Sequence, residues 1–61
     1  MNTYEWEIHY RDGETESFAS QDAGVRPSQG TMCVRDVGGR WHMLFMDAVR
    51  SIIITTRPEG A

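Results

Sequence analysis

The sequence predicts an all-β protein that folds as one small antiparallel barrel of five strands, with a short 3₁₀ turn before the last strand. Two observations carry this prediction. Apolar and polar residues alternate in several segments, as in half-buried strands, and turn residues such as glycine, proline and aspartate separate these segments. No stretch of about ten residues has the period of an amphipathic helix. A length of 61 residues allows a single domain over 1–61.

The first two strands are expected to form a hairpin. Residues 4–10 alternate strictly, with aromatic residues and an isoleucine on one face and polar residues on the other. Asp12 and Gly13 follow, a dipeptide that accommodates the positive φ angles of a tight turn. Residues 14–20 form the return strand. Residues 21–30, rich in glycine, proline and polar residues, are expected to form an exposed loop.

The remaining strands follow the loop. Two glycines separate the predicted strands 31–37 and 40–46, which form a second hairpin. Residues 47–49 interrupt the alternation and fit one 3₁₀ turn. Residues 50–56 are rich in isoleucine and threonine, which favour a strand, and Pro58 is expected to end it because proline cannot donate to the ladder.

The charge disfavours general binding to nucleic acid. Six basic residues, all arginine, stand against nine acidic residues, so the net charge is -3 and the molecule is mildly repelled by phosphate backbones. The acidic residues concentrate in the first hairpin, which could be a solvated face or a surface that docks a basic partner. These residues are Glu5, Glu7, Asp12, Glu14 and Glu16.

Several classes of protein are excluded by the same inspection. Cys33 is the only cysteine, so an internal disulfide or a zinc site of thiolates is not expected. His9 and His42 lack metal-ligand spacing and are expected on the exposed faces of their strands, and no nucleophile has an evident base. We therefore predict no enzyme, no metal and no cofactor. No apolar run is long enough for a membrane span, and the chain is expected to be cytoplasmic.

The segment 45–58 resembles the last two strands of the Sm-like family, in particular its bacterial RNA chaperones of the Hfq type, and the Asp12-Gly13 hairpin is similar to the family's opening strands. The resemblance implies an SH3-like barrel and a ring-like assembly. In these relatives, a lysine and a histidine before the alanine bind uridine in the pore. Met46 and Asp47 occupy those positions here. The resemblance thus implies the fold while making RNA binding of the pore type disfavoured.

Candidate binding residues come from the aromatic and basic sets. Most of the six aromatic residues are expected to fill the core, whereas Tyr10 and Trp41 are placed near a binding surface. For the alternative function, binding of RNA or single-stranded nucleic acid, the expected contacts are Arg35, Arg40 and Arg50 with aromatic stacking.

The last strand predicts self-association. Ile53 lies on the opposite face from Ile52 and Ile54, so one apolar face must point away from the interior. Leu44 and Met46, on the second face of the neighbouring strand, are expected to extend this patch. These five residues form the predicted interface of a homo-oligomer.

The function favoured by the sequence is that of a non-catalytic binding module. We expect an oligomeric small-barrel regulator or inhibitor that acts by binding a protein or a small ligand. Small size and the lack of an enzymatic signature fit proteins encoded by phages and other mobile elements.

Overall fold

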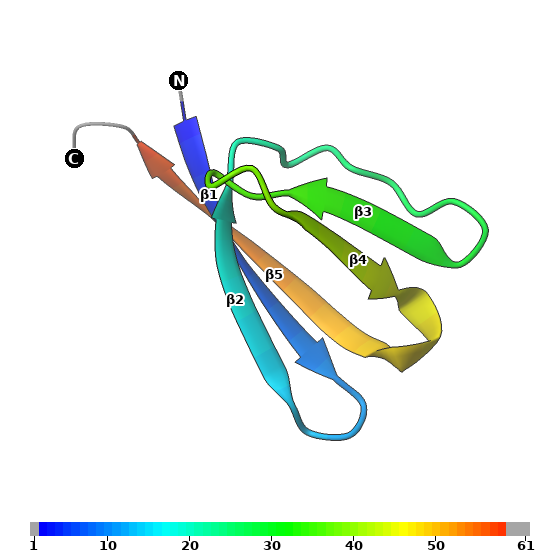
Figure 1. Ribbon diagram of the computed structural model, residues 1–61. Coiled ribbons are helices and arrows are strands. Elements are labelled where there is room, and N and C mark those ends of the chain that lie inside the picture. The colour runs from blue at the N-terminus through cyan, green and yellow to red at the C-terminus, as the bar shows by residue number, and fades with distance from the viewer. Residues whose placement is uncertain (1, 59–61) are drawn as a thin grey trace.

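The computed structural model describes residues 2–58, and these residues form five β-strands and one 3₁₀ turn (Figure 1). The elements are β1 (Asn2–Tyr10), β2 (Thr15–Ser20), β3 (Thr31–Arg35), β4 (Trp41–Phe45), the 3₁₀ turn η1 (Met46–Ala48) and β5 (Val49–Pro58). The prediction of an all-β fold with a 3₁₀ turn before the last strand is therefore confirmed.

The strands make two antiparallel sheets that do not close into a barrel. One sheet has the order β2-β1-β5 and the other is the β3–β4 hairpin. Between β2 and β3, the backbone meets only at the isolated bridge of Ser20 with Asp36 and at a 2.9 Å hydrogen bond from the Val37 amide to the Ala19 carbonyl. The predicted closed barrel is wrong for the described residues, because β2 and β3 meet only at their ends and β5 pairs only with β1.

The long strand β1 organises the first sheet. It pairs with β2 on one side and with β5 on the other, with Trp6 opposite both Phe18 and Ile54, and Ile8 opposite Ile52. These residues share the inner face, so the strict alternation of β1 sends its apolar side chains toward the second sheet. The outer face of β1 carries its glutamates.

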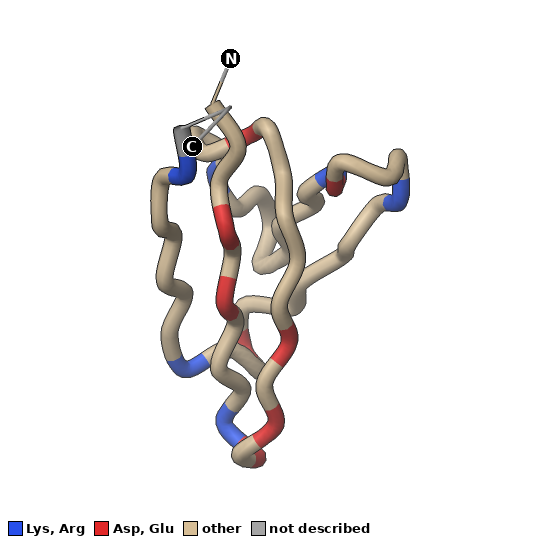
Figure 2. The backbone as a smooth tube through the Cα atoms, turned by 90° about the vertical axis from the view of Figure 1, so that its left-hand side faces the viewer, with Lys and Arg blue, Asp and Glu red and all other residues tan. Residues whose placement is uncertain are grey.

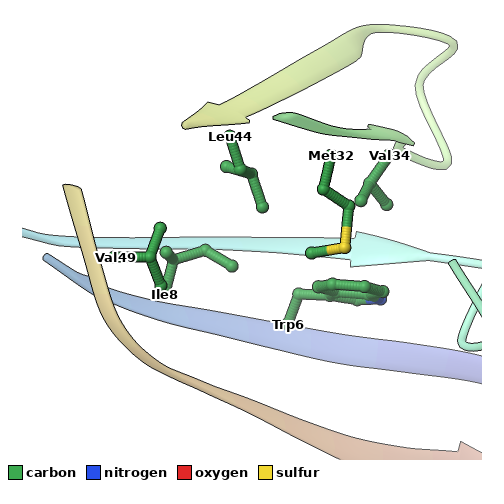
Figure 3. Packing of buried hydrophobic residues seen from close by; sticks show 6 residues of the cluster. All are labelled: Trp6, Ile8, Met32, Val34, Leu44 and Val49. Atoms are coloured by element: carbon green, nitrogen blue, oxygen red, sulfur yellow. The ribbon is translucent and has the colours of Figure 1, made fainter. Parts of the chain in front are cut away.

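The core lies between the two sheets (Figure 3). The first sheet contributes residues of β1 and the start of β5, and the second sheet contributes residues of β3 and β4. Each fully buried side chain of this size stabilises the fold by about 1.5–3 kcal/mol. Its buried members are Trp6, Ile8, Met32, Val34, Leu44 and Val49. A core this small leaves most of the remaining apolar side chains at least partly in contact with water.

The last strand is an edge strand and extends beyond its predicted end. It continues to Pro58, which is opposite Asn2. Proline is tolerated at this place because an edge strand needs ladder hydrogen bonds on one side only. In residues 2–58, no helix combines the length and the apolar character that crossing a membrane requires.

Candidate functional site

The turn of the β3–β4 hairpin is built around Asp36. Its Oδ1 accepts hydrogen bonds from the backbone amides of Gly38 and Arg40, both at 2.9 Å, and the Gly39 amide donates to the Asp36 carbonyl at 3.0 Å. Gly39 has a φ of 86°, a left-handed conformation that glycine adopts without steric cost. The local sequence thus fixes the turn, and the turn fixes which residues of β3 and β4 are opposite one another.

The hairpin register separates two very different faces. On the inner face, Met32 is opposite Leu44 and Val34 is opposite His42. On the outer face, a basic residue, a cysteine and a threonine of β3 are opposite three large apolar residues of β4. We call this outer surface the hairpin face, and it consists of Thr31, Cys33, Arg35, Trp41, Met43 and Phe45.

The hairpin face leaves its largest side chains in contact with water. Trp41 is 68% exposed, Met43 60% and Phe45 59%, although each is large and apolar. The Arg35 guanidinium carbon lies 6.0 Å from the centroid of the Trp41 ring, at the limit of a cation–π contact. The thiol-bearing residue Cys33 is also exposed, directly opposite Met43. This arrangement is an exposed apolar strip with a basic residue at one end.

The structure corrects the predicted facing of β4. Leu44 is buried in the core and Met46 packs partly buried against it, so these two residues do not form the exposed patch that the sequence analysis expected. Trp41 and Phe45 take the exposed positions instead. Arg35 could have indicated the facing of β4 from the sequence. An arginine next to the turn is expected to face solvent, and the residue opposite it, Trp41, lies on the same face.

The isoleucines of β5 divide between two faces. Ile52 packs against the core, and Ile54, opposite Trp6 on the same face, is 39% exposed at the sheet edge. Ile53 is opposite Glu7 on the outer face and is 50% exposed. The strand is therefore apolar on both faces, but its outward side carries a single isoleucine among polar neighbours.

The predicted binding residues fall into two groups. Trp41 and Arg35 come together on the hairpin face, and Arg40 lies in the turn beside them. Tyr10 and Arg50 lie at the opposite end of the first sheet, where Tyr10 is opposite Val49. The fold thus brings three of the five predicted residues together and leaves the other two at the far end of the first sheet.

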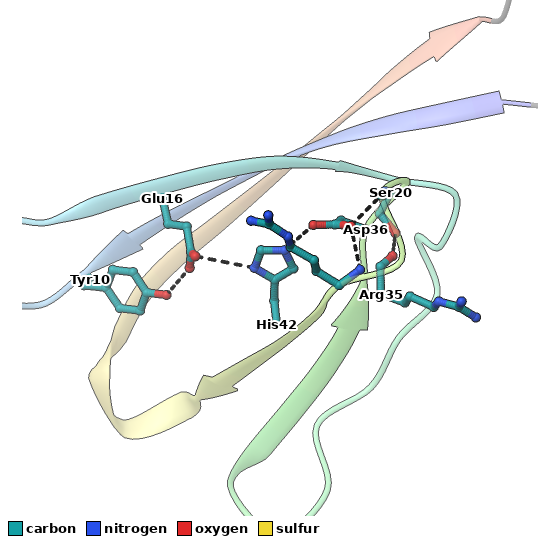
Figure 4. A network of polar contacts seen from close by, with 8 residues as sticks. Tyr10, Glu16, Ser20, Arg35, Asp36 and His42 are labelled. Carbon is teal, nitrogen blue, oxygen red and sulfur yellow. Dashed lines mark hydrogen bonds and ion pairs between the residues drawn. The ribbon is translucent and has the colours of Figure 1, made fainter.

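The inner face carries a polar network that the sequence analysis did not anticipate (Figure 4). His42 was expected on the exposed face, yet its ring stacks on the Phe18 ring between the two sheets, with the two ring centroids 4.0 Å apart. Its Nε2 lies 2.7 Å from Asp36 Oδ2, and its Nδ1 lies 3.4 Å from Glu16 Oε2. The hydrogen bond with His42, followed by that from the Arg40 amide, lowers the pKa of the Asp36 carboxyl below its ordinary value.

Tyr10 belongs to the same network. Its hydroxyl donates a 2.7 Å hydrogen bond to Glu16 Oε1, and its ring packs against the core. Burial, and then the hydrogen bond and charge of Glu16, raise the pKa of Tyr10 to about 12. The side chain predicted to lie near a binding surface is therefore half-buried and ties β1 to β2.

The acidic residues of the first hairpin do not form one continuous strip. Figure 2 shows them spaced along the first two strands and their turn, with the arginines mostly at strand ends and in turns. Glu5 and Glu7 share the outer face of β1, but Glu16 is opposite Ile8 and turns inward to His42. Glu5 Oε2 also forms an ion pair with Arg57 Nη1 at 3.6 Å. The acidic docking surface considered from the sequence is thus reduced to two glutamates.

Other chemistry has little support in the described part of the chain. A pocket of about 370 Å³ opens beside the hairpin turn and is lined by Gln21, Asp22, Arg35, Asp36, Val37 and Gly39. The Asp36 carboxylate there is already engaged by the turn amides and by His42. Residues 2–58 contain no group of three or more histidine, cysteine or acidic side chains that could hold a metal ion.

Comparison with family models, with curated proteins and with solved structures found no match to this chain. A function for this chain therefore has to be inferred from the geometry of the hairpin face and of the inner face of the β3–β4 hairpin.

Proposed function

We propose that this chain is a non-catalytic interaction module that binds another protein surface through the hairpin face. The observation that carries the proposal is the exposure of Trp41, Met43 and Phe45 on successive outward positions of β4, each close to 60% or more. Together they leave roughly 400 Å² of apolar surface in water, within the range of patches that mark interaction sites.

The composition of the hairpin face supports a protein partner. Tryptophan, methionine, phenylalanine and arginine are the residue types enriched in the cores of protein interfaces. The face is the solvent-exposed side of a two-stranded sheet, whereas small-molecule sites are concave and enclose most of their ligand. The pocket beside the turn is lined largely by polar residues, and it shares Arg35 with the hairpin face but none of the large apolar side chains of β4. A protein partner therefore fits better than a small ligand.

The strand order supports an SH3-like arrangement opened along one side. Consecutive strands form two antiparallel hairpins, β1–β2 and β3–β4, a 3₁₀ turn follows β4, and β5 returns beside β1. In this arrangement the second hairpin has the first sheet on one face and solvent on the other. The fold is thus suited to presenting a hairpin face to a partner.

Cys33 provides a direct test of this proposal, because it lies at the centre of the hairpin face. The rate of Cys33 alkylation by a maleimide should be measured in dilute purified protein and in the native cells. We expect alkylation to be at least about tenfold slower in the cells, since a docked surface excludes water and reagent. Equal rates in cells, in dilute protein and in concentrated protein would show that the face is never covered and would refute the proposal.

A second candidate, binding of single-stranded nucleic acid, is favoured by the exposed Trp41 ring beside Arg35. Bases stack on such rings, but a net charge of -3 and the exposed Asp47 oppose phosphate binding. We expect a uridine-rich oligonucleotide to quench tryptophan fluorescence weakly and only at low salt. Nanomolar binding in physiological salt that Trp41→Ala abolishes would rank this function first.

A further inference from the structure

We propose that the partner of the hairpin face is a second copy of this chain, docked face to face about a two-fold axis that passes beside Met43. This inference rests on the proposed function, because it names the partner of the same surface. It also assigns the predicted self-association to β4 and its outer face, away from the isoleucines of β5.

The order of side chains on β4 is self-complementary. Trp41 and Phe45 are aromatic and lie equally far on either side of Met43 along the outer face. A two-fold axis across the strands at Met43 places each Trp41 on the Phe45 of the other copy, with the two methionines between them. Offset or edge-to-face aromatic pairs and sulfur–aromatic contacts are both favourable. An isologous interface needs such a pattern, in which one patch matches itself.

The area of the face agrees with a weak dimer. Two copies would bury about 800 Å² from the apolar strip and about 1,000 Å² with its polar rim, which is the lower limit of specific interfaces. An interface of this size predicts a dissociation constant in the micromolar range, since association must also offset lost translational and side-chain entropy.

The charges at the two ends of β4 are complementary in the same arrangement. Arg40 directly precedes the strand and Asp47 follows it in η1, and both are exposed. The two-fold axis at Met43 brings the Arg40 end of one copy against the Asp47 end of the other. Opposite charges at the rim fix the orientation of two copies and reject the parallel stacking.

A matched pair of substitutions tests the proposal. Met43→Lys puts two ammonium groups against each other at the axis, whereas Ile53→Lys adds the same charge at a similarly exposed isoleucine on the outer face of the other sheet. By sedimentation equilibrium from low micromolar to millimolar protein, we expect Met43→Lys to weaken the dimer roughly a hundredfold or more and Ile53→Lys to leave it unchanged. Circular dichroism checks that both variants stay folded.

The orientation has its own test. Arg40→Asp and Asp47→Arg should each weaken the dimer, because each places two like charges against each other at the rim. The double variant should restore the dimer, because it swaps the two charges and so keeps opposite charges in contact. In the wild type, Cys33 of one copy faces Cys33 of the other across sheets about 10 Å apart, a separation that a short bismaleimide spans and a disulfide does not. We expect cross-linked dimer in the wild type and its loss in Met43→Lys.

The outcomes separate this inference from the proposed function. A wild type that is monomeric at millimolar concentration, or a dimer broken by Ile53→Lys and not by Met43→Lys, overturns the two-fold dimer. If Cys33 is then still protected in cells, a different protein covers the hairpin face and the proposed function stands. If Cys33 is protected in neither setting, both proposals fail.

Discussion

The two faces of β4 show how neighbouring residues of one strand reach opposite environments. Leu44 and His42 turn inward, where Leu44 is buried and His42 stacks on Phe18, while Trp41 and Met43 turn outward into water. By hydrophobicity alone, a tryptophan would displace a histidine from the interior. Register decides otherwise, because the strand alternates and one apolar set must face out.

The inward position tolerates a histidine because its polar atoms are satisfied. Both ring nitrogens lie near carboxylates of Asp36 and Glu16, and the ring face contacts Phe18. Burial of a polar group is costly only when it lacks a partner. The inner face is therefore a mixed surface held by packing and by polar contacts between elements, whereas no part of residues 2–58 covers the apolar side chains of the outer face.

The largest expected difference between the two faces comes from truncating each at its apolar centre. Leu44→Ala should cost about 2–5 kcal/mol of unfolding free energy because it opens a cavity in the core. Met43→Ala should change this free energy by about 0.5 kcal/mol or less in dilute protein. Because small domains have only about 3–5 kcal/mol of stability, Leu44→Ala should be largely unfolded by circular dichroism. A larger loss of unfolding free energy in Met43→Ala than in Leu44→Ala would mean that Met43, and not Leu44, faces the core.

A smaller difference in unfolding free energy is expected between alanine substitutions of two serines in β2. Ser20 is fully buried, donates a 2.6 Å hydrogen bond to the Arg35 carbonyl and accepts one from the Asp22 amide at 3.0 Å, so it links the two sheets. Ser20→Ala leaves these backbone groups unpaired and should cost about 1–3 kcal/mol in urea unfolding. Ser17→Ala, on the exposed face opposite Glu7, is the control and should have no measurable effect. Equal costs would argue against the contact between sheets at Ser20.

The polar network on the inner face predicts that the stability of the fold depends on pH in the acidic range. The folded protein holds the pKa of Asp36 below its ordinary value of 3.8, so the stabilisation is present above that pH and is lost as pH falls through the folded pKa. Asp36→Asn keeps the acceptor for the turn amides and should flatten the pH dependence of stability in this acidic window. Asp12→Asn, at an equivalent turn position that accepts from the Glu14 amide, is the matched control. An unchanged acid profile in Asp36→Asn would contradict the contact with His42.

The smallest effect appears only in strong alkali. The pKa of Tyr10 is about 12, above its ordinary value of 10.0, so the stability it contributes is present below pH 10 and is lost as pH rises toward 12. In absorbance titration, Tyr10→Phe should remove the late part of the tyrosinate signal. Glu16→Gln should lower this pKa only in part, because burial is the larger cause. Complete loss of the shift in Glu16→Gln would assign it to the carboxylate instead.

The sequence by itself determined the elements. The alternation around Trp6 and Ile8 predicted the inner face of β1, and the turn residues Asp12 and Gly13 predicted the first hairpin. The interruption after β4 predicted the 3₁₀ turn, displaced by one residue from Met46–Ala48. These features are local, because period-2 patterns and turn conformations depend on neighbouring residues.

Only the tertiary structure decided which face of β4 is inside and whether the sheets close. Both faces of that strand are apolar, so the pattern alone was ambiguous, and the pairing with Val34 and Arg35 of β3 settled it by register. The network around His42 joins residues of three strands and a turn, and its geometry depends on how the sheets pack. Closure likewise depends on β2 and β3 meeting along their length, and here they meet only at Ser20 and its neighbours because the chain leaves β2 there.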